Sequence, residues 1–454
     1  MKRHWRHVAC AGLLAGLGLA VSCASHRLMS EARGAWRRLP ALMRQVNPPV
    51  FPQADFNALE YGADPQGQRG CRAAIQRAIE VCHRQGGGRV SLPPGVYLCD
   101  GPLHLLSGVN LHVQEGAVLR FDTVADLYLP AVKVRWEGVV CYNYSPLIYA
   151  IGQERIGLTG KGRIEGQGRA YWNAWRKLQP AAQKRLRLMG ATETPEQSRV
   201  FGAGDFLRPT MVEFYECQNI LIEDLTFADS PFWTIHPVFS KNITIRNLVV
   251  KGYFWNDDGI DPDSCEDVLI ENCDVETHDD AISIKAGRDQ DAWSRPGARR
   301  IWVRNCRLRS EKANALCIGS ELSGGVEQVF FEKCRISSAR YGFNNKTNSD
   351  RGGFVRNVHL RDIMADTCRE QLIFFQTNYH SYRGGQFPTK LDCFFFTDVV
   401  VAHTDSAFIR IDGLAEAPIG RIWLSGVGVL QPNRRPLSIK HAQIIRGRRQ
   451  TNGS

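Results

Sequence analysis

Two acidic clusters recur along the chain at a spacing that can bring carboxyl groups together. The first is the run 256–261 (NDDGID) and the second is the run 278–282 (HDDAI), with Asp258 and Asp280 22 residues apart. This interval is about the length of one coil of a stacked β-repeat, so Asp258, Asp279 and Asp280 are predicted to share one patch. Hydrolysis of a glycosidic bond needs carboxyl groups on both sides of the scissile bond, one protonated as general acid and another ionised to activate water. The spacing therefore predicts glycosidase chemistry.

A strand-like phrase recurs around these clusters and indicates how they are positioned. Each copy alternates apolar and polar residues and is rich in Val and Ile, as a half-buried strand should be. The intervals are too short for a strand plus a full crossover helix each time, so the repeat predicts a solenoid. Because the units contain Gly, Asn and Asp turns with little helical patterning, a parallel β-helix fits better than an ankyrin or tetratricopeptide array. The copies span residues 219–227, 242–250, 267–275, 300–308, 328–336 and 357–365.

The repeat runs without an obvious break, which predicts a single all-β domain over residues 53–454, preceded by a linker over 24–52. Apolar residues at helical spacing within 74–82 predict a short amphipathic helix that caps the open edge of the first coil. The stretch 172–209 breaks the β pattern and is predicted to be a partly helical insertion. Both a lid over the cleft and a solvated excursion remain open for it.

The first residues have the pattern of a targeting segment. Three basic residues precede an uncharged run over 8–21, which is short for a bilayer span and matches a secretory signal peptide over residues 1–23. The run ends LAVSC and resembles a bacterial lipobox with Cys23 as the lipid-bearing residue, with ordinary cleavage as the alternative. We therefore expect an exported protein, either periplasmic or anchored to the outer membrane as a lipoprotein, or otherwise secreted.

Composition narrows the class of partner. The 57 basic and 46 acidic residues give a formal net charge of +11, which suits nucleic acid, an anionic membrane surface or an acidic polysaccharide. The signal peptide argues against nucleic acid. The 14 cysteines form no CxxC pair, and no His-rich cluster suggests a metal site, so buried free thiols, no cofactor and no metal are expected. We expect a monomer.

Several motifs in order resemble the family-28 glycoside hydrolases, the polygalacturonases and their relatives. They include NDDGIDPDSC at 256–265, DDAISIKAG at 279–287, IGSE at 318–321, and a pectin-enzyme-like opening over 56–101 (EYGADP, then GGGRVSLPPGVYL). The likeness covers most of the chain after about residue 55. It implies a right-handed parallel β-helix and inverting hydrolysis of α-linked galacturonide bonds without a metal. The implied substrate is an acidic plant polysaccharide or oligosaccharide such as pectin.

The resemblance also implies residue roles. Asp279 would be the general acid, and Asp258 with Asp280 would hold and deprotonate the attacking water. The chain departs from the family where a His is replaced by Asn314 and an Arg by Asn344. Loss of a guanidinium removes a bidentate carboxylate fork that one ammonium cannot replace. Predicted substrate-binding residues are Lys346, Asn314, His278, Trp233, His236, Asn344 and Tyr379.

Three alternatives stay open at this stage. The enzyme could trim galacturonides or hydrolyse a pectin side chain such as rhamnogalacturonan. A polysaccharide lyase on the same fold would need a calcium site, and no Asp cluster outside the hydrolase motif is free to hold that ion. A carbohydrate-binding β-helix with impaired catalysis is made conceivable by Asn314 and Asn344.

Overall fold

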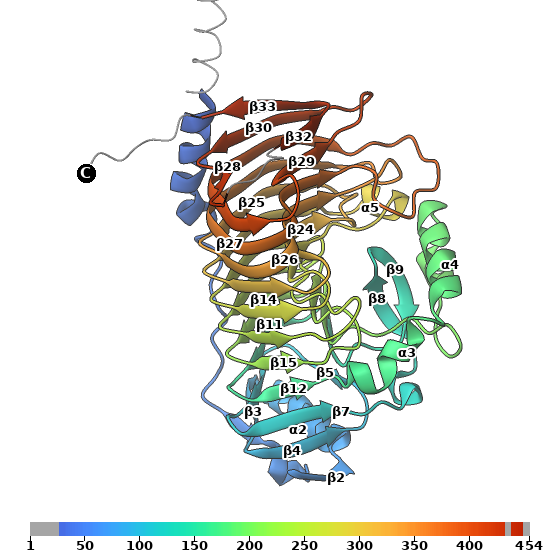
Figure 1. The fold of residues 1–454 in the computed structure, drawn as a ribbon. Helices are drawn as coiled ribbons and strands as arrows, with labels where there is room; N and C mark the ends of the chain where they lie inside the picture. Colours follow the sequence, from blue (N-terminus) through green and yellow to red (C-terminus); the bar gives the residue numbers. More distant parts are fainter. Residues whose placement is uncertain (1–26, 432–436, 448–454) are drawn as a thin grey trace, which may run out of the picture.

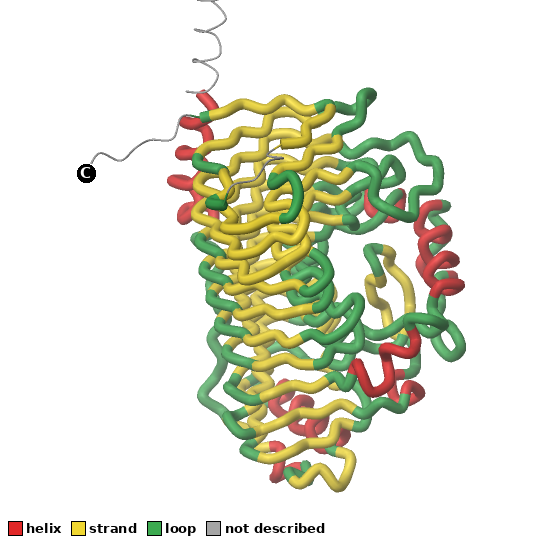
Figure 2. Tube along the Cα trace, in the orientation of Figure 1, coloured by secondary structure: helices red, strands yellow, loops and turns green. Residues whose placement is uncertain are grey.

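The computed structural model describes residues 27–431 and 437–447, in which stacked parallel strands form a β-helix with a helical excursion on one side (Figure 1; Figure 2). The predicted signal peptide and Cys23 lie outside the described residues. Among the described residues, no helix combines the length and apolar character needed to cross a membrane.

The first face of the solenoid is an unbroken ladder of parallel strands. In stacking order these are β1 (Asp55–Asn57), β3 (Gly88–Leu92), β6 (Val109–Val113), β11 (Glu154–Thr159), β14 (Gln218–Glu223), β17 (Lys241–Arg246), β19 (Glu266–Glu271), β22 (Ala298–Arg304), β25 (Val326–Glu332), β27 (Phe354–Gln376), β28 (Lys390–Thr404), β30 (Ile419–Ser425) and β33 (Ala442–Arg446).

The second and third faces repeat this arrangement, and the long strands β26, β27 and β28 bend from one face to the next. The second face contains β2 (Gln66–Gly70), β4 (Gly95–Cys99), β7 (Ala117–Phe121), β12 (Arg163–Glu165), β15 (Thr226–Ala228), β18 (Val249–Lys251), β20 (Asp274–Thr277), β23 (Arg307–Ser310), β26 (Arg335–Lys346) and β31 (Gly428–Val429). The third contains β5 (Leu103–His104), β10 (Ile148–Ile151), β13 (Val212–Tyr215), β16 (Ile235–Val238), β21 (Ile282–Ile284), β24 (Asn314–Gly319), β29 (Ile409–Asp412) and β32 (Leu437–Lys440).

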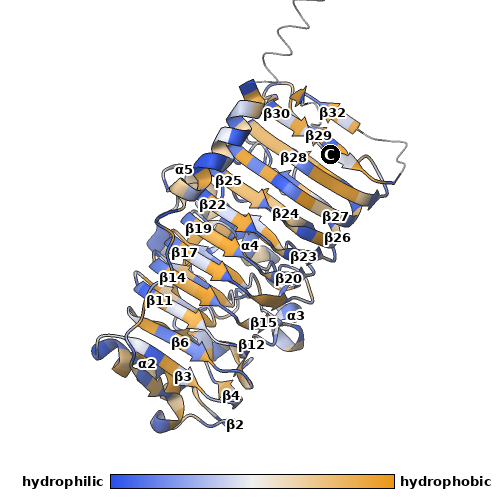
Figure 3. Ribbon diagram, turned by 90° about the vertical axis from the view of Figure 1, so that its left-hand side faces the viewer, coloured by the Kyte–Doolittle hydropathy of each residue, from blue (hydrophilic) through white to orange (hydrophobic). Residues whose placement is uncertain are grey.

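The recurring phrase explains both the register and the core. Its inward aliphatic position repeats on every coil, so that like residues stack in a column and are fully buried: Ile220, Ile243, Val268, Ile301, Val329 and Val358. Figure 3 shows hydrophobic segments on successive strands of this face lying above one another. At the corner after each such strand, Asp224, Asn247 and Asn272 have φ of 64°, 56° and 57°. This left-handed conformation is tolerated best by Gly, Asn and Asp, which accounts for the polar residue at that point of the phrase.

The predicted capping helix is confirmed. Helix α2 (Arg72–Arg84) buries Ala74, Ile75, Ala78, Ile79 and Cys82 against the first coils. It covers the sheet edge that an open solenoid would otherwise expose to other chains. The cysteines of the described ranges are buried free thiols, as expected.

The stretch predicted to be a linker contains an ordered helix over residues 27–42. Its apolar face, Leu28, Ala32, Ala35, Leu39 and Met43, recurs at intervals of three and four residues and is buried. It packs against the last coils of the solenoid, far from the first coil that the same chain then enters at β1 (Figure 1). The amphipathic spacing was the signal that would have predicted this helix.

The hairpin and the insertion form an excursion between the second and third faces. The antiparallel hairpin of β8 (Val132–Trp136) and β9 (Val139–Asn143) packs with the insertion through a second core. The insertion is partly helical, as predicted. It contains the π-turn η3 (Gly168–Trp172), α3 (Asn173–Trp175), α4 (Pro180–Ala191) and the short turn η4 (Glu196–Ser198). The remaining short elements are η1 (Ala58–Tyr61), η2 (Ala125–Tyr128) and α5 (Gln290–Trp293).

Candidate active site

The two acidic clusters meet on the third face because successive coils place them side by side. Backbone bonds tie the coils together: the Thr234 N–H donates to the Asp258 oxygen at 2.8 Å, and the Gly259 N–H donates to the Asp280 oxygen at 2.9 Å. The Ala281 N–H in turn donates to the Asn314 oxygen at 2.8 Å. One carboxylate oxygen from each of Asp258, Asp279 and Asp280 lies within 4.8 Å of the others. The structure therefore brings the three predicted carboxyl groups together.

The environments of Asp279 and Asp280 push their pKa values in opposite directions. Burial and the neighbouring Asp280 charge raise the pKa of Asp279, against the opposing effect of Lys346. Burial would also raise the pKa of Asp280, but the charges of Lys346 and Lys285 and the hydrogen bonds from Lys346 and Asn314 lower it overall. Two carboxyl groups with pKa values driven apart are suited to act as acid and base.

Asp280 is held on both carboxylate oxygens. Lys346 Nζ donates to Oδ2 at 2.6 Å, and the side-chain amide of Asn314 donates to Oδ1. Asn344 Nδ2 donates to Asn314 Oδ1 at 2.9 Å, so the two asparagines form a relay that ends on Asp280. The side chains that replace the family's His and Arg thus orient the predicted base. Lys346 is engaged by a carboxylate of the protein itself.

A second lysine neutralises the other side of the patch. Lys285 Nζ lies 3.4 Å from Asp258, 3.6 Å from Asp261 and 3.6 Å from Glu321. Burial, followed by the charges of Asp261 and Asp279, raises the pKa of Asp258 well above its usual range. The indole of Trp233 lines the cleft, with Lys285 Nζ 4.0 Å from its ring centre.

Asp257 supports the patch from behind, a role that the sequence did not reveal. Its carboxylate accepts the backbone N–H groups of Asp279 at 2.9 Å, His278 at 3.0 Å and Phe254 at 2.9 Å. These bonds join the loops that contain the two acidic clusters. Burial raises the pKa of Asp257 to about 7, against the lowering effect of the N–H donors.

Two predicted site residues lie away from the cleft wall. His236 is buried between Glu213 and Asp263, at 3.4 and 3.5 Å. Burial opposes its protonation, but the hydrogen bonds to Asp263 and Glu213 prevail and raise its pKa to about 9. His278 packs edge-on against Trp255, with Nδ1 3.2 Å from Glu311. Among the described residues that line the cleft, neither histidine appears.

The cleft has a volume of about 720 Å³, and Asp258 and Asp279 of the acidic patch line its floor, whereas Asp280 is fully buried behind them. Strand β26 contributes Asn344 and Lys346, and the loop after β27 contributes Tyr379, whose pKa burial raises to about 12. The insertion forms the opposite wall, so it lies over the cleft rather than standing free in solvent. Its cleft-lining residues are Arg176, Gln179, Pro180, Gln183 and Arg187.

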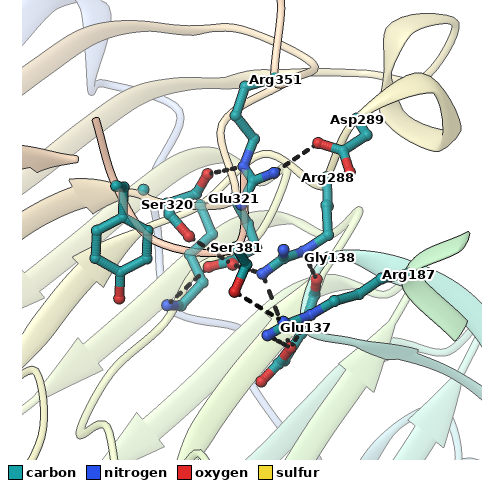
Figure 4. A network of polar contacts seen from close by, with 12 residues as sticks. Glu137, Gly138, Arg187, Arg288, Asp289, Ser320, Glu321, Arg351 and Ser381 are labelled. Atoms are coloured by element: carbon teal, nitrogen blue, oxygen red, sulfur yellow. Dashed lines mark hydrogen bonds and ion pairs between the residues drawn. The ribbon is translucent and has the colours of Figure 1, made fainter. Parts of the chain in front are cut away.

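An ionic network joins the walls at one part of the cleft (Figure 4). Arg187 on α4 pairs with Glu137 of the hairpin at 2.5 Å and donates to Ser381 Oγ at 3.3 Å. Arg288 pairs with Glu321 at 2.6 Å and donates to the Glu137 carbonyl oxygen at 3.0 Å. The network therefore connects the insertion, the hairpin and the loop that contains Ser381.

The patch has the donor atoms for a cation. Asp258, Asp279 and Asp280 form the group of acidic side chains in the described part of the chain that is spaced to hold one. The ammonium groups of Lys346 and Lys285 already lie against Asp280 and Asp258. These two positive charges offset part of the carboxylate charge, and the prediction of no metal remains a prediction.

The cleft contains carboxyl groups whose pKa values are shifted in opposite directions. This arrangement suits acid–base hydrolysis of a glycosidic bond. Residues 203–430 match the model of the glycosyl hydrolases family 28. A probable polygalacturonase of Vitis vinifera is 27% identical over 421 residues, covering 88% of this chain and 80% of that protein. The structure of a hyperthermoactive exopolygalacturonase from Thermotoga maritima is 33% identical, with a TM-score of 0.87 and coverage of 92% of this chain and 96% of the other.

A polygalacturonase from Erwinia carotovora ssp. carotovora, 22% identical with a TM-score of 0.69, covers 88% of this chain and 98% of its own and shares the fold. These matches confirm the predicted right-handed parallel β-helix. The chain belongs to glycosyl hydrolase family 28 and is a glycoside hydrolase that acts on O-glycosyl bonds.

Proposed function

We propose that the protein is an exported, exo-acting hydrolase of α-linked galacturonide bonds in pectin or pectic oligosaccharides. The observation that carries the hydrolytic role is the opposite direction of the pKa shifts at Asp279 and Asp280, in one carboxyl patch on the cleft floor. The substrate is supported by the polygalacturonase relatives. Export is supported by the pattern of residues 1–23.

In the proposed reaction, Asp279 donates its proton to the glycosidic oxygen as the bond to the anomeric carbon breaks. Asp280, with Asp258 beside it, accepts a proton from the water that attacks the same carbon. The leaving sugar departs with a free hydroxyl, and the new hydroxyl on the anomeric carbon comes from water. Asp279 is partly exposed, whereas Asp258 and Asp280 are buried, which suits an acid that must reach the substrate.

Asp279→Asn tests this assignment because the amide keeps the shape of the side chain but cannot donate the proton. Loss of a general acid typically lowers the rate ~10²–10⁴-fold. The measurement is release of reducing ends from oligogalacturonides, with thermal melting as the control for folding. Activity within a few-fold of the wild-type value would rule out Asp279 as the acid.

The stereochemistry needs its own test. Inverting enzymes usually separate their two carboxyl groups by roughly 6.5–9.5 Å, and retaining enzymes by roughly 5–5.5 Å. The 4.8 Å within which the nearest oxygens of the patch lie is a closest approach and not the separation of the carboxyl groups. We propose inversion, because both oxygens of Asp280 are bonded, to Lys346 and to Asn314, which suits a group that holds water rather than one that attacks carbon. Proton NMR of the first product formed decides the question, and a retained anomer would refute the single displacement.

Exo action is supported by the bridge from Arg187 to Ser381, which joins opposite walls of the cleft. We propose that this bridge closes one end of the cleft, so that a polymer cannot thread through it and cleavage starts at a chain end. The similarity to the Thermotoga maritima exopolygalacturonase supports the same proposal. Chromatography of early products from polygalacturonate tests it: an exo enzyme releases one short product from the start, whereas an endo enzyme gives a mixture of lengths.

A second candidate is hydrolysis of a pectin side chain such as rhamnogalacturonan. The observation that favours it is Asn344, whose position lacks the guanidinium that grips a uronate in the family. A panel of pectic oligosaccharides separates the two candidates by the substrate that is hydrolysed fastest. The same panel tests the catalytically impaired carbohydrate-binding alternative, which would bind without releasing product.

A further inference from the structure

An exposed aromatic side chain, Trp255, lines the same cleft as the proposed general acid Asp279. Trp255 lines the cleft with 41% of its surface exposed. The next residue, Asn256, uses its backbone N–H to bond Asp279 Oδ2 at 3.0 Å. The backbone next to the indole is therefore bonded to the carboxyl group of the proposed general acid, and both side chains line the same cleft.

The backbone that presents the indole is firmly fixed. Buried Arg208 donates from Nη1 to the Trp255 carbonyl oxygen at 3.0 Å and from Nη2 to Asn256 Oδ1 at 2.7 Å. The ring of His278 packs edge-on against the indole, with centroids 4.8 Å apart and an interplanar angle of 81°. Glu311, 3.2 Å from His278 Nδ1, holds that imidazole in place. His278 therefore supports the indole and is not itself among the cleft-lining residues.

A cation accompanies the indole. The guanidinium of Arg176, from the insertion, lies 4.9 Å from the centre of the Trp255 ring. Within the described residues, no carboxylate pairs with Arg176, whereas Arg187 and Arg288 in the same cleft are both paired. A guanidinium stacked near an aromatic ring keeps its in-plane N–H donors available for a carboxylate. Lys312, also in the cleft lining, is paired with Glu311 at 3.2 Å.

We propose that Trp255 and Arg176 form a subsite for the leaving-group uronate, in which the indole stacks on the sugar ring and the guanidinium binds its carboxylate. This proposal rests on the proposed hydrolysis for its orientation relative to the scissile bond. It supplies the carboxylate recognition that Asn344 cannot provide, from a different element of the fold. The insertion then has a direct part in choosing the substrate.

Binding measurements in an Asp279→Asn background test the subsite without turnover. Trp255→Ala is expected to weaken trigalacturonate binding about tenfold or more, as measured by calorimetry. Trp255→Phe keeps a flat ring and is expected to restore most of that affinity. The chain offers a matched control in Tyr253, which is 40% exposed, has the Arg169 guanidinium 3.9 Å from its ring, and is not among the cleft-lining residues. Tyr253→Ala and Arg169→Gln are expected to leave binding unchanged.

The role of the carboxylate is tested with a trisaccharide whose carboxyl groups have been reduced to alcohols. Arg176→Gln should weaken binding of trigalacturonate about tenfold and leave the reduced analogue nearly unaffected, whereas Trp255→Ala should weaken both. Equal losses on both ligands for Arg176→Gln would overturn carboxylate recognition by this residue. Equal effects of Trp255→Ala and Tyr253→Ala would overturn the subsite as a whole.

The outcome is separable from that of the proposed function. If the wild-type protein released no reducing ends from any galacturonide but the Trp255 and Arg176 variants still lost binding selectively, the hydrolytic proposal would fail and the subsite would stand. If the wild-type protein hydrolysed a galacturonide but the Trp255 and Arg176 variants bound it as tightly as the parent protein, the subsite would be refuted and the hydrolytic proposal would stand.

Discussion

Lys346 is predicted to set the pH at which the enzyme becomes active. Its ammonium donates to Asp280 Oδ2 at 2.6 Å, and both side chains are buried. An opposite charge at such a distance lowers the pKa of a carboxyl group by ~1–3 units. In Lys346→Met this contribution is lost, so Asp280 becomes ionised only at a higher pH. The acid limb of the kcat/KM profile is therefore expected to move upward by ~1–3 pH units.

This shift of the acid limb predicts a change in rate that depends on pH. At a pH below the wild-type limb, activity should fall ~10–10³-fold, while near the top of the profile the loss should be smaller because Asp280 is ionised in both proteins. The assay is the initial rate of reducing-end release between pH 3 and 8. Lys346→Arg retains the charge and should keep the limb close to its wild-type position. Lys251→Met removes a lysine from the surface pair with Glu276 and serves as the matched control.

An unchanged acid limb in Lys346→Met would refute the reasoning, because it would show that Lys346 does not control the protonation of Asp280. The sequence also suggested that Lys346 grips a substrate carboxylate. If it does so in addition, KM should rise for a uronate substrate and much less for its carboxyl-reduced analogue. The two roles are therefore separated by the pH profile and by the comparison of substrates.

Further predictions concern stability and positioning. Burial, with a smaller effect of Arg38, lowers the pKa of His359 to about 3, so the unfolded state, with a pKa of about 6.5, binds the proton first as the pH falls. Unfolding free energy should thus fall by about 2 kcal/mol between pH 7 and 5 through this group, and urea titrations of His359→Phe should lack that part of the loss. Trp36→Ala should speed amide hydrogen exchange in residues 27–42 while the solenoid stays protected, because the ring centres of Trp36 and Phe330 lie 5.2 Å apart. Exchange that rises equally in all coils would contradict this. Asp257→Ala should lower kcat by up to ~10²-fold with little change in KM, since it frees the Asp279 loop without touching the substrate; an effect on KM alone would argue against positioning.

The parts of the fold that could be predicted are those encoded in local pattern. The inward Val and Ile of each phrase predicted the strands of the first face. The corner inside each phrase, at Asp224, Asn247 and Asn272, was not predicted, and the structure divides each phrase between two faces. Asp258, Asp279 and Asp280 could be grouped because their spacing matches one coil. Helix α2 was found from the same kind of periodicity.

What was missed depends on contacts between distant parts of the chain. Nothing local to Asp257 shows that it accepts the N–H of Asp279, and nothing near Asn344 shows that it is bonded to Asn314. Nothing in the sequence around Trp255 distinguishes it from the other aromatic residues, and only the folded structure shows that it is exposed in the cleft. The helix over 27–42 was visible in principle, since its apolar spacing is regular, but its docking surface lies hundreds of residues away.

That docking surface governs the order in which the protein can assemble. The helix over 27–42 precedes the described strands in the chain, yet it packs on Phe330, Phe395 and Trp423, which belong to β25, β28 and β30. During synthesis from the N-terminus, the surface that covers its apolar face is therefore absent until β25, β28 and β30 have been made. Such non-local docking must close a long loop before its contacts form, and the apolar segment stays exposed until then. The helix can dock only when these later coils are in place. A chain truncated before β28 would therefore leave part of its apolar face exposed.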